Sequence, residues 1–211
     1  MLWLSDLHLD GGDAAEDFSA DDVLVEFLRF WHRRERIGLA GDTADLAQAT
    51  LAEIERAHPR AAQAIEDYVT WLLIGNHDPV PQLFGHWTAD AVLVRGVYVT
   101  HGSCFDPLNF GRYRFIGWAG AKAGGTLERV FGADADDWVT RRLGGLLSSG
   151  RFGDASAYRR RALSLMKRIP GAESIVIGHT HKRAVEPPYY NCGNWTGQDA
   201  GRRCDHILIG T

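Results

Sequence analysis

The chain opens with Met1-Leu2-Trp3-Leu4-Ser5-Asp6-Leu7-His8, an apolar run that ends in a carboxylate and an imidazole two positions apart. The apolar residues predict a buried strand over residues 1–5. Polar side chains just past such a strand favour a functional site, because sites in open α/β sheets collect at the carboxyl ends of the strands. If the segment stays extended, Asp6 and His8 point the same way and can reach one ion.

Four further strands are predicted, and each also ends in polar residues. Three are short apolar runs at residues 37–40, 69–74 and 174–177, and the fourth completes a hairpin, 91–94 with 97–100, that turns at Arg95-Gly96. The motifs that follow are G-D-T-A-D (41–45), G-N-H-D (75–78), H-G (101–102) and G-H-T-H (178–181). A lone Asp-x-His or Gly-Asp is commonplace, but five motifs in order, each after a strand, indicate one shared site.

Helical patterns separate several of these strands. Ser19 is a predicted N-cap, with Asp22 three residues later, of a helix that runs to about residue 34. Residues 46–67 predict two helices split at Pro59, because proline breaks a helix interior. Near the end, 189–192 and 206–209 are predicted to form a closing pair of strands. Together these elements predict an α/β protein.

Between residues 104 and 169 the strand signals disappear, and helical stretches are predicted near 126–131, 136–147 and 155–169. We interpret 104–169 as a helical cap inserted into a single domain that spans 1–211. Residues 158–169 combine an apolar stripe with a basic side. The stripe either packs on the rest of the domain or contributes to substrate selection, and the basic side is suited to peripheral contact with an anionic membrane.

The composition is that of an ordinary soluble globular protein: 211 residues, 45% hydrophobic and 24% charged, with a formal net charge of −4. This charge argues against a dominant nucleic-acid surface, which usually makes a domain strongly basic. Three widely spaced cysteines, Cys104, Cys192 and Cys204, do not indicate a disulfide framework. With no signal-like start and no apolar run long enough to cross a bilayer, the expected location is the cytoplasm, with the membrane surface as an alternative.

The residue types in the five motifs predict a metal centre. Imidazole and carboxylate ligands suit Mn²⁺, Fe and Zn²⁺, and the motifs contain no thiolate. Asp42 has two carboxylate oxygens and can bridge two ions. Glycines at 41, 75, 102 and 178 allow sharp backbone turns beside the ligands. The remaining histidines, which we interpret as surface or core residues, are His32, His58, His86 and His206.

The motif order D-x-H, G-D-x-x-D, G-N-H-D, H-G and G-H-x-H resembles the calcineurin-like metallophosphoesterase superfamily, and the match runs from Asp6 to His181. The resemblance implies a four-layer α/β/β/α sandwich, here with the helical cap. It also implies two divalent metal ions, with Mn²⁺ expected first and Fe or Zn²⁺ as alternatives. By resemblance, the first ion is held by Asp6, His8 and His181, the second by Asn76, His101 and His179, and Asp42 bridges them.

Three tracts resemble the UDP-2,3-diacylglucosamine diphosphatase group within that superfamily. They are residues 5–9, 101–106 and 178–182, and the helical insertion before the last histidine motif is similar as well. Two positions differ: His77 stands where that group commonly has Arg, and Ser103 where it usually has Asp. His77 is typical of the wider superfamily. The resemblance therefore implies the metal chemistry, with a lipid-linked UDP-sugar as one candidate substrate.

The expected function is that of a dinuclear metal-dependent phosphoesterase acting on a small-molecule phosphodiester, phosphomonoester or diphosphate. The resemblance and the ligand set imply a hydroxide shared by the two ions that attacks phosphorus. His77, held by Asp78, is the expected catalytic side chain, which protonates the leaving group or binds a phosphate oxygen. Asp45 either orients a ligand or caps a helix.

Other functions are weighed against this one. A nuclease or a cyclic-nucleotide phosphodiesterase would use the same ligands, although the acidic net charge counts against a nuclease. A protein serine/threonine phosphatase would be expected to have Arg-Gly after Asp45, where this chain has Leu46-Ala47. A non-catalytic binding scaffold is the alternative from another class, and the complete ligand set argues against it.

Overall fold

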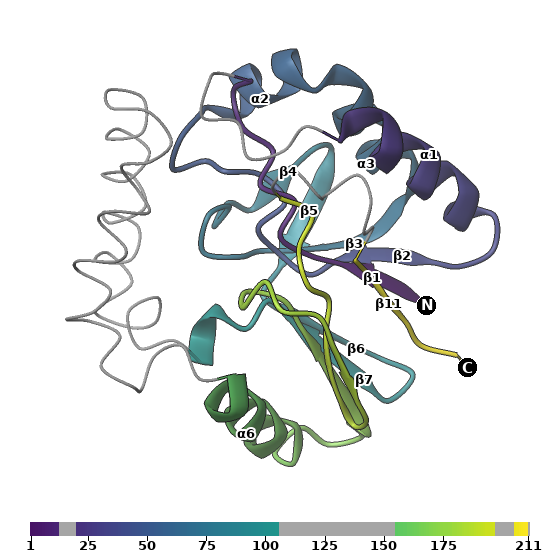
Figure 1. Cartoon of the computed structure of the whole chain (residues 1–211), viewed down its shortest axis with the longest axis vertical. Helices are drawn as coiled ribbons and strands as arrows, with labels where there is room; N and C mark the ends of the chain where they lie inside the picture. Colours follow the sequence, from purple (N-terminus) through teal and green to yellow (C-terminus); the bar gives the residue numbers. More distant parts are fainter. Residues whose placement is uncertain (13–19, 106–154, 197–204, 211) are drawn as a thin grey trace.

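The structure, a computed structural model, describes residues 1–12, 20–105, 155–196 and 205–210. Within these residues two β-sheets lie face to face, and helices cover both outer faces (Figure 1). The layers follow the order helix, sheet, sheet, helix, so the expected α/β/β/α arrangement is confirmed.

The first sheet has a parallel centre and antiparallel edges. The central strands follow one another along the chain, which brings their carboxyl ends to one side of the sheet. Across the sheet the strands are β11 (Ile207–Leu208), β1 (Leu2–Leu4), β2 (Ile37–Leu39), β3 (Val69–Leu73), β5 (His86–Ala89) and β4 (Gln82–Leu83).

The second sheet begins with the predicted hairpin. Its two strands pair antiparallel, and Arg95 and Gly96 turn the chain with φ values of 51° and 76°, as a two-residue hairpin loop requires. Across the sheet the strands are β6 (Ala91–Val94), β7 (Val97–Thr100), β8 (Ser174–Ile177), β10 (Tyr189–Asn191) and β9 (Ala184–Glu186).

Three helices cover the first sheet: α1 (Asp21–His32), α2 (Leu51–Ala57) and α3 (Pro59–Tyr68). Pro59 is the first residue of α3, where its missing N–H costs nothing, so the predicted split is confirmed. The cap of α1 is Ala20, so the predicted cap at Ser19 is wrong, and Ser19 itself lies outside the described residues. Thr50 caps α2 in a capping box with Glu53.

Alternating side chains divide the apolar core into three layers. On β1, Leu2 and Leu4 belong to the core under α1–α3, while Trp3 between them belongs to the core between the two sheets. On β8, Val176 faces that inner core, and Ile175 and Ile177 face outward. The period of two along each strand thus places one face of each sheet against the other sheet and one face against helices.

Helix α6 (Ala155–Met166) covers the outer face of the second sheet. Tyr158 and Ala162 are buried there in one cluster with Ile175, Ile177 and Tyr189. The apolar stripe predicted for this region therefore packs on the sheet. Most of the predicted cap, including the stretches 126–131 and 136–147, lies outside the described residues, apart from the short 3-10 helix η1 (Ser103–Phe105) and α6 itself.

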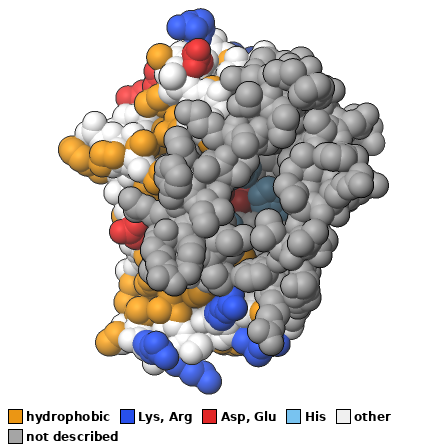
Figure 2. All heavy atoms as spheres, turned by 90° about the vertical axis from the view of Figure 1, so that its left-hand side faces the viewer, with side chains coloured by type: hydrophobic (Ala, Val, Ile, Leu, Met, Phe, Trp, Pro, Cys, Tyr) orange, Lys and Arg blue, Asp and Glu red, His pale blue; other side chains and the backbone are white. Residues whose placement is uncertain are grey.

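The other side of α6 is basic, as the sequence predicts. Arg159 forms an ion pair with Glu186 at 2.8 Å, and Arg160 donates to Ser156 Oγ at 2.8 Å. Figure 2 shows Lys and Arg side chains gathered at the lower end of the molecule, where α6 lies in Figure 1. Contact of these residues with a membrane surface stays a prediction. A helix with the length and apolarity to span a bilayer is not found in the described part of the chain.

The predicted closing pair of strands is wrong. β10 pairs with β8 and β9 in the second sheet, whereas β11 pairs with β1 in the first sheet. The chain crosses from one sheet to the other between them, and Trp195 is buried in the core under the helices. Strands β4, β5 and β9 were not predicted from the sequence.

Candidate metal centre

The five predicted motifs meet at one end of the sandwich. Three follow β1, β2 and β3 of the first sheet, and two follow β7 and β8 of the second. The loops after β1 and β2 stay hydrogen-bonded beyond the strands, with Asp6 N donating to Gly41 O at 3.1 Å and His8 N to Asp42 O at 3.0 Å. Figure 2 shows imidazole and acidic side chains together near the middle of this face.

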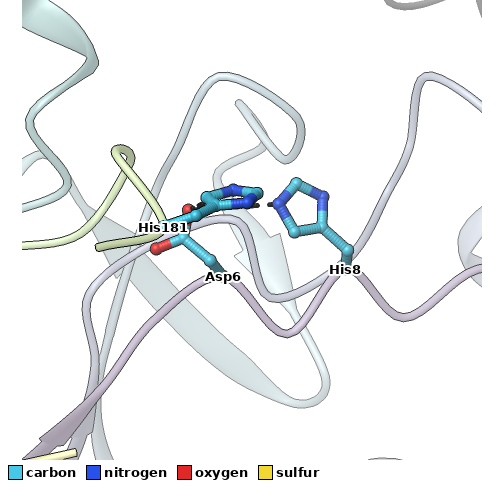
Figure 3. A group of neighbouring side chains, drawn as sticks. All are labelled: Asp6, His8 and His181. Carbon is cyan, nitrogen blue, oxygen red and sulfur yellow. Dashed lines mark ion pairs between the residues drawn. The ribbon is translucent and has the colours of Figure 1, made fainter. Parts of the chain in front are cut away.

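Asp6, His8 and His181 form one group of candidate ligands (Figure 3). Their ligand atoms lie within 4.8 Å of one another. His181 Nε2 lies 3.2 Å from Asp6 Oδ1, and His8 Nε2 lies 3.9 Å from the same oxygen. The carboxylate is fully buried, and the backbone N–H of His179 donates to it.

Asp42, His101 and His179 form a second group with the same spacing. His101 Nε2 lies 3.0 Å from Asp42 Oδ2 and 3.2 Å from Asn76 Oδ1. The other ring nitrogen, Nδ1, lies 2.9 Å from the carbonyl oxygen of Ala40. If Nδ1 donates a hydrogen bond to that carbonyl, Nε2 is left as the atom that binds a metal. Metal-binding histidines are usually supported in this way through their second ring nitrogen.

Asp42 of the second group lies beside His8 of the first. His8 Nε2 is 3.9 Å from Asp42 Oδ2, and together with His77 these residues form a third, overlapping group. His8 Nε2 is buried and has no hydrogen-bond partner among the described residues. A buried, unpaired nitrogen is costly, and it faces two carboxylates at a distance that leaves room for a cation. The donor set therefore fits bound metal, with Asp42 shared.

The ligand residues have an unusual backbone. Asp6, His8, Asp42, His179 and His181 all have positive φ, between 50° and 66°. The left-handed conformation costs an L-residue roughly 1–2 kcal/mol, so five such residues in one place indicate a functional constraint. The expected reason for convergence, extended D-x-H and H-x-H segments, is wrong, because residues i and i+2 converge through left-handed turns.

The four glycines beside the ligands serve two different needs. Gly41 and Gly102 have φ of 94° and 102°, which confirms the predicted sharp turns. Gly75 and Gly178 are required by space: a Cβ on Gly75 would overlap the Asp42 carboxylate, and one on Gly178 would overlap Ser5 Oγ and the Asp6 carboxylate.

Gly178→Ala is therefore expected to displace Asp6. We expect the metal affinity to fall by roughly 10–100-fold, the usual result of misplacing a ligand's support, and the free energy of unfolding to fall by about 1–3 kcal/mol, the usual cost of overpacking. Metal titration and urea unfolding measure the two effects. Gly210→Ala is the matched control, because a Cβ at Gly210 meets no atom within 4 Å. Unchanged metal affinity in Gly178→Ala would contradict this account.

His77 is held by Asp45, so the expectation that Asp78 holds it is wrong. His77 Nδ1 lies 3.1 Å from Asp45 Oδ1, and His8 Nδ1 lies 3.9 Å from Asp45 Oδ2. Because Thr50 caps α2, Asp45 is not the cap of that helix. Of the two interpretations of Asp45, orienting the histidines is the one that fits.

Asp78 instead organises the backbone of the centre. Its buried carboxylate accepts from the N–H groups of Gly75 at 2.6 Å and of Thr43 at 2.7 Å, with longer bonds from Asp42 and Ala44. Burial and the negative charge of Asp42 raise the pKa of Asp78 to about 6, although these N–H donors oppose the shift. Asp78 thus ties the loop after β2 to the loop after β3.

The side chains alone form a network of opposite charges. Burial raises the pKa of Asp42, but the charges of His101 and His77 outweigh it and hold that pKa well below its usual value. Burial lowers the pKa of His101, but the charge of Asp42 outweighs burial and raises this pKa to about 10. Burial also lowers the pKa of His77, and there Asp42 and Asp45 together raise it to about 9. Since metal ligands must be deprotonated, an incoming cation competes with these protons.

Asn191 is a supporting residue that the sequence did not single out. Its side-chain amide donates to Gly178 O and to Thr180 Oγ1, both at 2.9 Å, and its oxygen accepts from Gly193 N at 3.0 Å. It therefore fixes the loop that carries His179 and His181. An asparagine within the predicted strand 189–192 was the available signal.

The four histidines outside the motifs take no part in the candidate groups found among the described residues. His58 is buried and lies 2.9 Å from Asp21 Oδ1, while His32 stacks on Tyr68 with ring centroids 4.5 Å apart. Their interpretation as core and surface residues agrees with this placement.

No family model matches the chain, and no curated protein matches it. Among solved structures, the chain is similar to a conserved uncharacterized protein of Streptococcus pneumoniae described as a predicted phosphoesterase. The identity is 13% and the TM-score 0.36, over 92% of this chain and 71% of the other. The function is therefore inferred from the residues of the centre.

Proposed function

We propose that the chain is a dinuclear metal-dependent phosphoesterase that hydrolyses a phosphodiester, phosphomonoester or diphosphate. The observation that supports it most is the position of the buried Asp42, which belongs to the second ligand group and lies 3.9 Å from His8 Nε2 of the first. Bound cations in such a pair supply Lewis acidity at the phosphoryl oxygens and lower the pKa of a water molecule towards about 7.

The residues divide between two cations. Asp6, His8 and His181 would hold the first, Asn76, His101 and His179 the second, and Asp42 would bind both. Carboxylate, amide and imidazole donors without thiolate suit Mn²⁺ first, with Fe or Zn²⁺ as alternatives. The free thiol of Cys192 is buried between the sheets and belongs to neither group.

His77 would assist the leaving group. Asp45 lies beside Nδ1 of the His77 ring, so Nε2 is the nitrogen free to donate a proton or to bind a phosphate oxygen. A side chain in this role must be placed without itself binding a cation, and the neighbouring carboxylate does that by fixing the ring and its tautomer.

The substrate class follows from the sequence resemblance rather than from the fold. A UDP-sugar with a lipid chain is one candidate, and cyclic nucleotides and simple monoesters are others. The proposal concerns small molecules, since the chain has a net charge of −4 and no strongly basic composition.

The test is metal-activated hydrolysis by the whole chain. Protein stripped with EDTA and reloaded with Mn²⁺ is expected to hold close to two ions and to cleave a chromogenic phosphodiester. Stripped protein without added metal should be inactive. A panel of UDP-sugars, cyclic nucleotides and monoesters then ranks the substrates. Absence of bound metal after loading, measured by elemental analysis, would show the proposal to be wrong.

A further inference from the structure

A hollow lined by arginines lies at the end of the sandwich opposite the candidate metal centre. Met1 lines it, as do residues that precede β2 and the turn between β6 and β7, whereas the metal-ligand motifs follow the strands. In Figure 1 this is the side of the N-terminus, and the metal centre opens on the other side, which faces the viewer in Figure 2. The hollow has a volume of about 420 Å³.

Four arginines line this hollow, which we call the arginine pocket. Arg33, Arg34 and Arg36 come from the end of α1 and the turn into β2, and Arg95 comes from the β6–β7 turn. The one carboxylate in the lining, Glu35, is ion-paired with the amine of Met1 at 2.7 Å. The lining of this pocket is therefore positively charged, although the whole chain has a net charge of −4.

Among the described residues, none of the four guanidinium groups is ion-paired with a carboxylate. The side chains of Arg33, Arg36 and Arg95 are exposed. Arg34 is held in place, since it lies 3.9 Å from the centroid of the Phe30 ring and donates to Phe30 O. Like charges gathered in one hollow repel one another, and a bound anion would remove that cost. Guanidinium groups bind phosphate oxygens in pairs.

The wall of the pocket is aromatic. Trp71 lines the hollow from β3, and its ring is stacked on the buried Trp3 with centroids 5.5 Å apart and planes 20° apart. This stacking fixes the ring, so a flat ligand group can stack against it at little entropic cost. The volume of the hollow lies in the range of about 300–1,000 Å³ that is typical of small-molecule sites.

We propose that the arginine pocket binds a nucleotide, with its phosphates on the guanidinium groups and its base against Trp71. Clustered arginines together with a fixed indole favour a nucleotide over two other ligands. A simple anion would not require the indole, and an apolar molecule would not require the arginines. The site is separate from the candidate metal centre and uses none of its residues.

The test is calorimetric binding of ADP to the whole chain in EDTA, which removes any contribution from metal-bound phosphate. Wild type is expected to bind one ADP. The Arg36→Glu/Arg95→Glu variant should weaken binding by about tenfold or more. The control is Arg160→Glu/Arg168→Glu, an equal change of charge at and just beyond α6, and it should stay within about twofold of wild type.

A third variant separates the base from the phosphates. Trp71→Leu should weaken ADP while pyrophosphate binds as before, and circular dichroism confirms that this variant is folded. Equal ADP affinity in wild type and Arg36→Glu/Arg95→Glu, or no heat up to about 1 mM ADP, would mean that the arginines are only solvated. Pyrophosphate binding as tightly as ADP would exclude the role of Trp71. If a single-stranded oligonucleotide bound more tightly than ADP through the same arginines, the ligand of the pocket would be nucleic acid and not a free nucleotide.

Discussion

Asp42→Ala is expected to lose both cations and to lower phosphodiester hydrolysis by about 10³-fold or more, since two-metal sites supply several kcal/mol of charge stabilisation. The reason is the position of its carboxylate, which is 2% exposed and lies 3.0 Å from His101 Nε2 and 3.9 Å from His8 Nε2. Removing it takes a ligand from the second group and the proposed bridge to the cation of the first. Elemental analysis and the chromogenic assay measure the two losses.

Two controls accompany this variant. In the wild type the backbone N–H of His77 donates to Asp42 Oδ1 at 2.8 Å. Asp42→Asn keeps an oxygen that can accept this hydrogen bond and removes only the negative charge. Asp22→Ala removes a carboxylate that is exposed on α1 and pairs with Arg60, and it should leave metal content and activity unchanged. If Asp42→Ala retained two ions and its activity, the shared carboxylate could not be the bridge.

His77→Ala is expected to keep both cations and to lower the rate by roughly 10²–10⁴-fold, the usual contribution of a general acid or base. The side chain is partly exposed, at 21%, and its Nδ1 lies 3.1 Å from Asp45 Oδ1. Asp45→Asn should reproduce part of the loss, because the ring stays but its orientation is weakened. The measurements are the metal content and the rate at saturating substrate.

The competing interpretation is that His77 is itself a ligand, because its ring nitrogen also lies within reach of His8 and Asp42. Loss of one ion from His77→Ala would decide in favour of that interpretation. His32→Ala, a change of an exposed histidine on α1, is the control for a general effect of removing an imidazole.

The strands that carry the centre were predictable because each is a short apolar run followed at once by polar residues. The strands that were missed lack that pattern. β4 and β5 are joined by Phe84 and Gly85, both at positive φ, and their residues alternate only weakly between buried and exposed. β10 and β11 were paired wrongly because nearness in sequence favours a hairpin, whereas the chain between them crosses to the other sheet.

Within the centre, the sequence identified which residues come together but not how they are held. The side chains of His77 and Asp78 point in different directions. Asp78 accepts hydrogen bonds from backbone N–H groups, whereas His77 lies beside Asp45, thirty-two positions earlier in the chain. The left-handed conformations of the ligand residues depend on contacts between loops, such as those of Asn191, which no local pattern encodes.

Each ligand group draws on both sheets. Asp6 and His8 follow a strand of the first sheet and His181 a strand of the second, and the same division separates Asp42 from His101. A cation held by either group would cross-link the two halves of the sandwich. Its binding would add to the cohesion of the inner core by RT ln(1 + [L]/Kd), about 2.7 kcal/mol when the free cation is at a hundred times its Kd. Chelators would then act on this protein as mild denaturants, and the cellular supply of the ion would set its lifetime as well as its chemistry.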